Sequence, residues 1–257
     1  MTMNLAYLGT DIERASLSKP KNLGWVSACS PDSPARQRPI NLDSPPPRSV
    51  QKTFISDHLR SMDPCDHPEL FYHHGQFLSH NLGPGPQPIL IPEFSYCSTV
   101  LHHNIRIPTP YSWVEDIYPR SHDPEWDDKF DDRLLWRGSN TGMFHSKTTR
   151  WKHSQRDFLV EFANDLDGVL DVLPYDRSKN EKLVETRELK KDIINPITLD
   201  IAFAGQPIAC TPEVCDLLKH TYPWHKRQSN KDAGNYKYVI DVSVFSVPPS
   251  LKIHRSL

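Results

Sequence analysis

The segment at residues 134–142, LLWRGSNTG, joins an apolar run to residue types that bind anions. Arg137 carries a planar guanidinium that can donate two parallel hydrogen bonds to phosphate oxygens. Ser139, Asn140 and Thr141 add short donors, and Gly138 lets the backbone approach a ligand closely. Because these donors follow one another along the chain, the segment predicts a loop that binds a diphosphate.

The same residues also fit a purely structural interpretation. In it, Arg137 pairs with a nearby carboxylate and the glycines only turn the chain. The segment is neither a Walker loop nor a GxGxxG fingerprint, so on composition alone the structural interpretation is the stronger one. The acids nearest in sequence are Asp127, Asp128, Asp131 and Asp132.

The elements around this segment predict an α/β fold with a parallel sheet. RLLWRG (133–138) and LDIAFAG (199–205) are short apolar runs that end in glycine, and YKYVIDVSVF (236–245) forms a third strand pattern. A helix is predicted between the first two strands, and another after Thr211, the expected N-cap, with Pro212 at its first position. The apolar residues that predict one face of the first helix are Trp151, Phe158, Leu159, Phe162 and Leu166.

This alternation of strands and helices is typical of a sheet whose ligands bind at the carboxyl ends of the strands. The predicted loop then leaves the carboxyl end of the strand at 133–138. By contrast, many of the 24 prolines lie in the first half of the chain, and residues 18–50 are predicted to be loop.

Composition excludes several classes of protein. The net charge of -2 and a pI of about 6.7 give no basic footprint for nucleic acid. No run approaches the roughly 20 apolar residues of a membrane span, and the first residues lack a signal-peptide core. The five cysteines form no CxxC pair; Cys210 and Cys215 either form a disulfide across a turn or are buried thiols.

Histidines are the other potential metal ligands, but their spacing is weak evidence for a site. His67, His73 and His74 lie close together in the sequence, and His102 and His103 are adjacent. Packing or solvent exposure explains them better than metal binding, so no metal is predicted.

Seven segments occur in the order of a known family. They are HPE...HGQF, IPEFS, NIRIPTPYSW, LLWRGSNTG, W...QRDFLVEF, LDIAFAG...C....C and YKYVIDV, and they span about Cys29 to Val242. This order closely resembles the capsule-associated glycosyltransferases of family 90, which include the Rumi-type protein O-glucosyltransferases. WRGS-x-TG beside NIRIPTPYSW is the most specific part of the resemblance.

The resemblance implies an α/β, GT-B-like fold with two Rossmann-like lobes, of which the second is incomplete here. It divides the chain into a poorly defined segment (1–28), a partial acceptor-side lobe (29–130), a partial donor-binding lobe (131–242) and a tail outside the family pattern (243–257). The chain is expected to be truncated at both ends relative to the family.

The resemblance also implies a reaction and a site. Family members transfer a sugar from a UDP-sugar with inversion, here glucose or xylose, to a polysaccharide or glycoprotein acceptor, and the Rumi-type members need no metal. The donor's diphosphate would contact Arg137, Gly138, Ser139 and Thr141. The family works in the ER or Golgi lumen or at the Golgi membrane, an oxidising setting that would permit the Cys210–Cys215 disulfide.

Several departures from the family pattern leave a second hypothesis open. The family's general base is sought in N-x-x-D-E-P-R, and the nearest match, NLDSPPPR, offers Asp43 at a different spacing; an aspartate that starts a proline-rich turn is the alternative. Asn104 replaces a family aspartate. After Val242 the D-G-N-x-x-S-x-R motif with its second diphosphate arginine is missing, and Arg255 does not lie in such a motif. The alternative is therefore an inactive remnant or binding module of the same fold.

Overall fold

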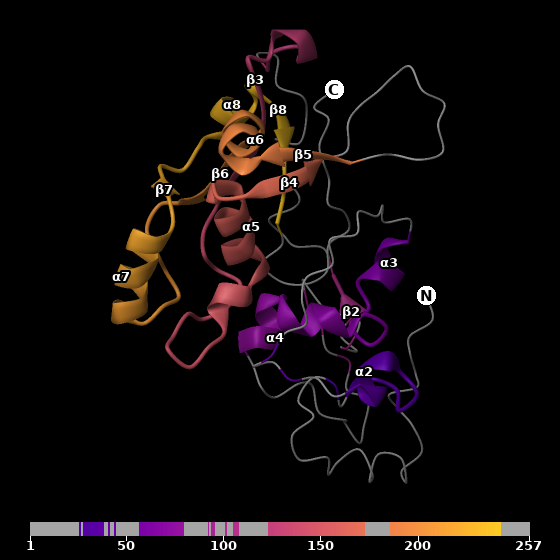
Figure 1. Ribbon diagram of the computed structural model, residues 1–257. Coiled ribbons are helices and arrows are strands. Elements are labelled where there is room, and N and C mark those ends of the chain that lie inside the picture. Colours follow the sequence, from indigo (N-terminus) through magenta and orange to yellow (C-terminus); the bar gives the residue numbers. More distant parts are fainter. Residues whose placement is uncertain are drawn as a thin grey trace, which may run out of the picture.

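The computed structural model has an α/β fold, in which helices pack on a β-sheet (Figure 1). It describes residues 26, 28–38, 41, 44, 57–79, 92, 94–95, 101, 105–107, 123–172 and 186–242. The predicted strand at 236–245 therefore lies partly outside the described residues.

The central sheet has four strands in the order β7-β6-β3-β8, and all its pairs are parallel. Its strands are β3 (Asp131–Gly138), β6 (Leu199–Ala204), β7 (Trp224–His225) and β8 (Tyr236–Val239). The predicted parallel sheet is confirmed, as are the strands predicted at 133–138 and 199–205. Two-residue β7 was not predicted, because so short a strand has no periodicity to detect.

When the four strands are renumbered 1 to 4 by their position in the chain, their order across the sheet is 3-2-1-4. After β3 the chain adds β6 and then β7 on one side of β3, and β8 then pairs with the other side of β3. Doubly wound nucleotide-binding sheets begin with the same order, and their ligands bind where the order reverses. Here that switch point lies between β3 and β8.

Two amphipathic helices cover one face of the sheet. They are α5 (Gln155–Asn164) and α7 (Pro212–Thr221), and both contribute to a core that includes Trp136 and Phe203. The rings of these two aromatic residues meet edge to face at 5.8 Å, and Phe203 also stacks on Trp224 at 4.8 Å. Thr211 and Pro212 occupy the predicted N-cap and first positions of α7, although the Thr211 side chain makes no capping hydrogen bond.

The first helix differs from the prediction in its bounds and in its buried face. Ser154 accepts a hydrogen bond from the Asp157 backbone N–H and so starts α5 at Gln155. Trp151 consequently lies in the preceding turn η7 (Trp151–His153), and Leu166 follows the helix with 52% of its surface exposed. The buried residues of α5 are Arg156, Asp157, Val160 and Ala163, so the predicted aromatic face was wrong.

Five further elements lie around the sheet. A hairpin of β4 (Val169–Val172) and β5 (Arg187–Lys190) leads directly into α6 (Lys191–Thr198), which contacts α5. The turn η6 (Trp126–Asp128) precedes β3, and α8 (Asn230–Ala233) precedes β8.

The N-terminal part has its own small core around a disulfide between Cys29 and Cys65. Its elements are α2 (Pro34–Gln37), α3 (His58–Ser61), η3 (Pro68–Tyr72), α4 (Gly75–Ser79) and the parallel pair β1 (Phe94–Ser95) and β2 (Ile105–Arg106). The prediction of loop throughout 18–50 was wrong at α2, because Pro34 sits at the start of the helix, where a missing N–H costs nothing. No helix in the described parts of the chain is long and apolar enough to cross a membrane.

Candidate functional site

The candidate site is the loop that leaves the carboxyl end of β3, residues 139–142, hereafter the β3 loop. It begins beside the switch point between β3 and β8, where parallel sheets of this order place their ligands. Two glycines shape it. A Cβ at Gly138 would lie 2.5 Å from the Trp136 ring. Gly142 has a φ of 115°, a value that residues other than glycine rarely adopt.

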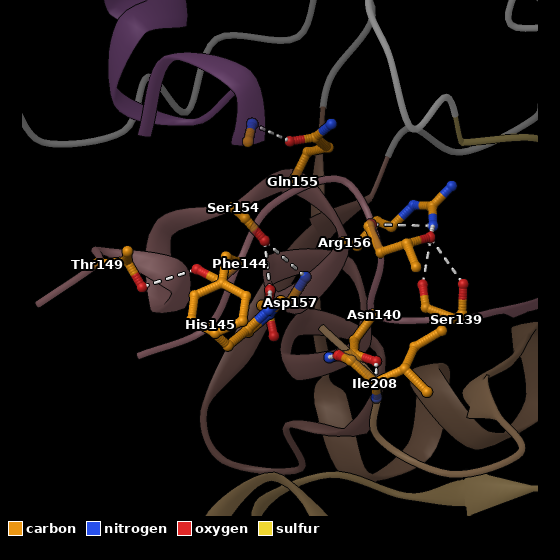
Figure 2. Close-up of polar contacts among 12 residues, drawn as sticks. Ser139, Asn140, Phe144, His145, Thr149, Ser154, Gln155, Arg156, Asp157 and Ile208 are labelled. Carbon is orange, nitrogen blue, oxygen red and sulfur yellow. Dashed lines mark hydrogen bonds and ion pairs between the residues drawn. The ribbon is translucent and has the colours of Figure 1, made fainter. Parts of the chain in front are cut away.

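Arg156 of α5 fastens the β3 loop from the side of the core (Figure 2). Its Nη1 donates to the carbonyl oxygens of Ser139 (2.8 Å) and Thr141 (3.1 Å) and to Thr141 Oγ1 (3.1 Å). Its Nη2 donates to the carbonyl oxygen of Val242, just after β8 (2.6 Å). One buried guanidinium therefore bridges the chain segments on both sides of the switch point.

Burial makes Arg156 an unusual cation. Desolvation lowers the pKa of its guanidinium, although the charges of Asp241 and Asp157 oppose this effect. The guanidinium also lies 5.8 Å from the Trp136 ring centre, a cation–π distance. The site thus contains a partly desolvated positive charge directly behind the β3 loop.

Asn140 fastens the β3 loop to the loop after β6, residues 205–211, hereafter the β6 loop. Its Nδ2 donates to the Ile208 carbonyl (2.6 Å), and its Oδ1 accepts from the Ile208 N–H (2.9 Å). The side chain is almost fully buried, so both amide atoms depend on this pairing (Figure 2). The role of Asn140 is structural, and it keeps the β3 loop at a fixed place on the sheet edge.

Arg137 makes contacts that its sequence neighbours do not reveal. Its Nη2 pairs with Asp200 Oδ1 at 2.5 Å, and its Nη1 donates to the carbonyl oxygens of Asp200 and Trp136. Asp200 lies beside Leu135 in the sheet register, whereas Arg137 lies beside Ala202, so the guanidinium points back along the strand. Arg137 is therefore paired with a carboxylate, but with one 63 positions away rather than with the four acids nearest in sequence.

Asp200 is the centre of a small charge network on this face of the sheet. Tyr236 donates to its Oδ2, and Arg133 lies 3.5 Å from the same oxygen while pairing mainly with Asp131. Burial alone would raise the pKa of Asp200, but the hydrogen bonds from Tyr236 and Arg137 outweigh burial and lower the pKa. Asp200 is consequently a carboxylate that holds Arg137 in place.

The β3 loop retains donors that no described residue uses. No hydrogen bond from the backbone N–H groups of residues 139–142 reaches another described residue. The hydroxyls of Ser139 and Thr141 lie 2.8 Å apart and bond to each other. Consecutive backbone N–H groups next to hydroxyls are suited to binding phosphate oxygens.

Helix α4 forms one side of the site. The Gly75 N–H donates to Gln155 Oε1 (2.9 Å), and a Cβ at Gly75 would lie 2.7 Å from the Gly142 carbonyl oxygen. Burial lowers the pKa of the neighbouring His74 to about 4, so this imidazole is neutral at pH 7. Gly75 thus packs directly against Gly142 of the β3 loop, a contact that the sequence did not predict.

A second polar cluster lies beneath the β3 loop, but it does not have the geometry of a catalytic triad. His145 Nε2 lies 3.1 Å from Asp157 Oδ2, and the Ser154 hydroxyl donates to the same oxygen. The aspartate therefore stands between the serine and the histidine, whereas a triad needs the histidine in the middle. All three side chains are buried, and the cluster fixes the start of α5.

The remaining predicted site residues divide into described and undescribed ones. Asp43 and Asn104 lie outside the described residues, as do His102 and His103. His67 pairs with Glu69 at the surface, and His73 Nδ1 lies 3.4 Å from the His153 carbonyl oxygen. The described residues contain no cluster of three or more potential metal ligands.

Both disulfides of the structure involve described cysteines. Cys210 and Cys215 are bonded across the start of α7, so the disulfide interpretation of this pair is the one found. The Cys29–Cys65 disulfide was not predicted, because pairing over 36 positions cannot be deduced from spacing.

Arg156 was not predicted from the sequence, and Asn140, predicted as a donor to the ligand, instead has its side-chain amide bonded to Ile208. The only signal for Arg156 was a cation in the first turn of a helix, where a cation is not favoured by the helix dipole. Comparison with known proteins adds no further evidence, since no family model, curated protein or solved structure matches this chain.

Proposed function

We propose that the protein is a UDP-sugar-dependent glycosyltransferase whose β3 loop binds the donor's diphosphate. The observation that carries the proposal is the position of this loop: it leaves β3, one of the two inner strands, at the switch point of a parallel sheet, where it has unused N–H donors. The order of the sequence motifs, with WRGSNTG at this position, supports a sugar nucleotide as the ligand.

In this proposal the backbone N–H groups of residues 139–142 and the hydroxyls of Ser139 and Thr141 bind phosphate oxygens. Arg156 contributes positive charge from behind the loop, and its bonds keep the loop in shape before the ligand arrives. Such preorganised donors stabilise the negative charge that develops on a departing diphosphate. Gly138 allows the chain to leave the sheet without striking Trp136.

Arg137 joins the donor site by leaving the Asp200 carboxylate and binding the diphosphate instead. Its guanidinium is held by Asp200 in this structure, and a diphosphate would compete with that carboxylate for the same fork of donors. The general base that accepts the acceptor's proton is proposed to be Asp43, which lies outside the described residues. The transfer inverts the sugar, either glucose or xylose, and requires no metal.

The proposed acceptor is a polysaccharide or glycoprotein, and the proposed location is the lumen of the ER or Golgi. The two disulfides support an oxidising compartment, since disulfides are rare in the cytosol. The GT-B arrangement of two Rossmann-like lobes is part of the same proposal; the strand order supports one such lobe in residues 131–242.

One observation favours the second candidate, an inactive remnant or binding module of the same fold. Both arginines near the β3 loop donate to protein acceptors, Arg137 to Asp200 and Arg156 to backbone carbonyls. If neither changes partner, the loop binds an anion weakly and supports no transfer.

Thermal unfolding with and without UDP, UDP-glucose and UDP-xylose tests the proposal. Millimolar UDP should raise the melting temperature, because a ligand that binds only the folded state stabilises it. Arg137→Gln should reduce this ligand-induced shift, whereas Arg227→Gln, at an exposed arginine, should leave it unchanged. Binding without turnover of either UDP-sugar would favour the binding module, and no shift at millimolar UDP would rule out the donor site.

A further inference from the structure

The β6 loop connects the candidate site to a disulfide that solvent can reach. Cys210 lies next to the last residue of this loop and is bonded to Cys215 in the first turns of α7. Both cysteines are half-buried, whereas Cys29 and Cys65 are only 2% and 6% exposed. A small reductant should therefore reach the Cys210–Cys215 disulfide before the other one.

The backbone just before this disulfide is strained. Ala209 has a φ of 52°, and it is the only residue other than glycine with positive φ among those the structure describes. This conformation is unfavourable for alanine and persists only where its surroundings impose it. The Cys210–Cys215 bond on one side and the Asn140–Ile208 pairing on the other impose it here.

Backbone bonds tie the same segment to the chain that follows the β3 loop. The His145 N–H donates to the Ala209 carbonyl (2.8 Å), and the Thr211 N–H donates to the His145 carbonyl (3.0 Å). Together with the Asn140–Ile208 pairing, these bonds form a continuous connection from the disulfide to the β3 loop. The other end of the disulfide is fixed, because α7 is held in the core by Val214 and Leu218.

We propose that the Cys210–Cys215 disulfide is a thiol-sensitive clamp that holds the β3 loop in its binding conformation, so that reducing it weakens diphosphate binding. The proposal rests on the diphosphate function of the β3 loop. Once the bond is open, Ala209 can relax to negative φ, and Ile208 then loses the position that Asn140 requires. The β3 loop keeps its Arg156 contacts but loses its tie to the β6 loop.

The chemistry is an ordinary thiol–disulfide exchange with a dithiol. A thiolate of the reductant attacks one sulfur and forms a mixed disulfide, and the second thiol of the reductant then displaces the protein sulfur. Cys210 and Cys215 gain two electrons and two protons and become thiols. The reductant becomes a cyclic disulfide.

The test uses limited dithiothreitol, with mass spectrometry of alkylated thiols to find conditions that open Cys210–Cys215 and leave Cys29–Cys65 intact. Hydrogen exchange of the peptide that covers the β6 loop should accelerate by about tenfold or more, because the Ile208 N–H loses its bond to Asn140. The dissociation constant for UDP should rise by about tenfold for the same reason. The double variant Cys210→Ser/Cys215→Ser, in which the Cys29–Cys65 disulfide stays oxidised, should show the same faster exchange and the same weaker UDP binding.

Three results would overturn the clamp or its foundation. Unchanged exchange of the Ile208 N–H after selective reduction shows that no clamp exists. Faster exchange with unchanged UDP affinity refutes its control of binding. Failure of the oxidised protein to bind UDP refutes the diphosphate function of the loop, and the exchange data then still decide whether the disulfide holds the loop.

Discussion

Replacing Arg156 with methionine should destabilise the fold, because no other described side chain bridges the ends of β3 and β8. The change removes four hydrogen bonds from a charged donor, with a gross loss of about 6 kcal/mol at about 1.5 kcal/mol each. Roughly half of this loss is returned, because methionine has no charge that folding must remove from water. The expected decrease in the free energy of unfolding is therefore about 3 kcal/mol, or about 8 °C in melting temperature.

Urea denaturation of matched variants measures this effect. Arg227→Met serves as the control, because Arg227 is an exposed arginine on the same sheet edge as the β6 loop. Arg156→Lys should lie between Arg156→Met and wild type, since an ammonium keeps the charge but lacks the fork that reaches both sides of the switch point. If Arg156→Met and Arg227→Met unfold within about 1 kcal/mol of each other, the bridge contributes little and the reasoning is wrong.

Three more perturbations have expected outcomes. Gly138→Ala should destabilise the protein by about 1–3 kcal/mol in denaturant titrations, because its Cβ would overlap the Trp136 ring; a neutral result would mean that the ring moves freely. Asp200→Asn should cost about 3 kcal/mol by leaving Arg137 buried without its carboxylate, while Asp216→Asn, which breaks an exposed pair with Lys219, should leave stability nearly unchanged. His74 should make stability depend on pH: its pKa is 6.5 in the unfolded chain and about 4 when folded, so its contribution of about 3 kcal/mol is present above pH 6.5 and is lost as the pH falls toward 4. His74→Gln should flatten that part of the stability profile, and an unchanged slope would assign the dependence to other groups.

The parallel sheet was predictable because its two central strands carry near-continuous apolar runs. Such runs are typical of strands buried on both faces, and glycine marks the end of each. The N-terminal bound of α5 was less predictable. Trp151 continues the helical spacing in the sequence, but the Ser154 cap starts the helix four residues later.

The location of the β3 loop was predicted, but the contacts that shape it were not. Arg137 and Asp200 are separated by 63 positions, and Asn140 and Ile208 by 68, so only the folded sheet brings each pair together. The same holds for Arg156, whose acceptors reach 86 positions along the chain. Local sequence patterns identify elements and their ends, whereas the partners of buried polar groups depend on tertiary packing.

The central claim, that the β3 loop binds a diphosphate, is tested most directly by titrating UDP into isotopically labelled protein and following the backbone amide resonances of residues 139–142. If the β3 loop binds the diphosphate, the resonances of these amides should shift saturably with UDP, and those at the exposed end of α7 should shift less. Shifts confined to other parts of the chain, or none at millimolar UDP, would contradict it.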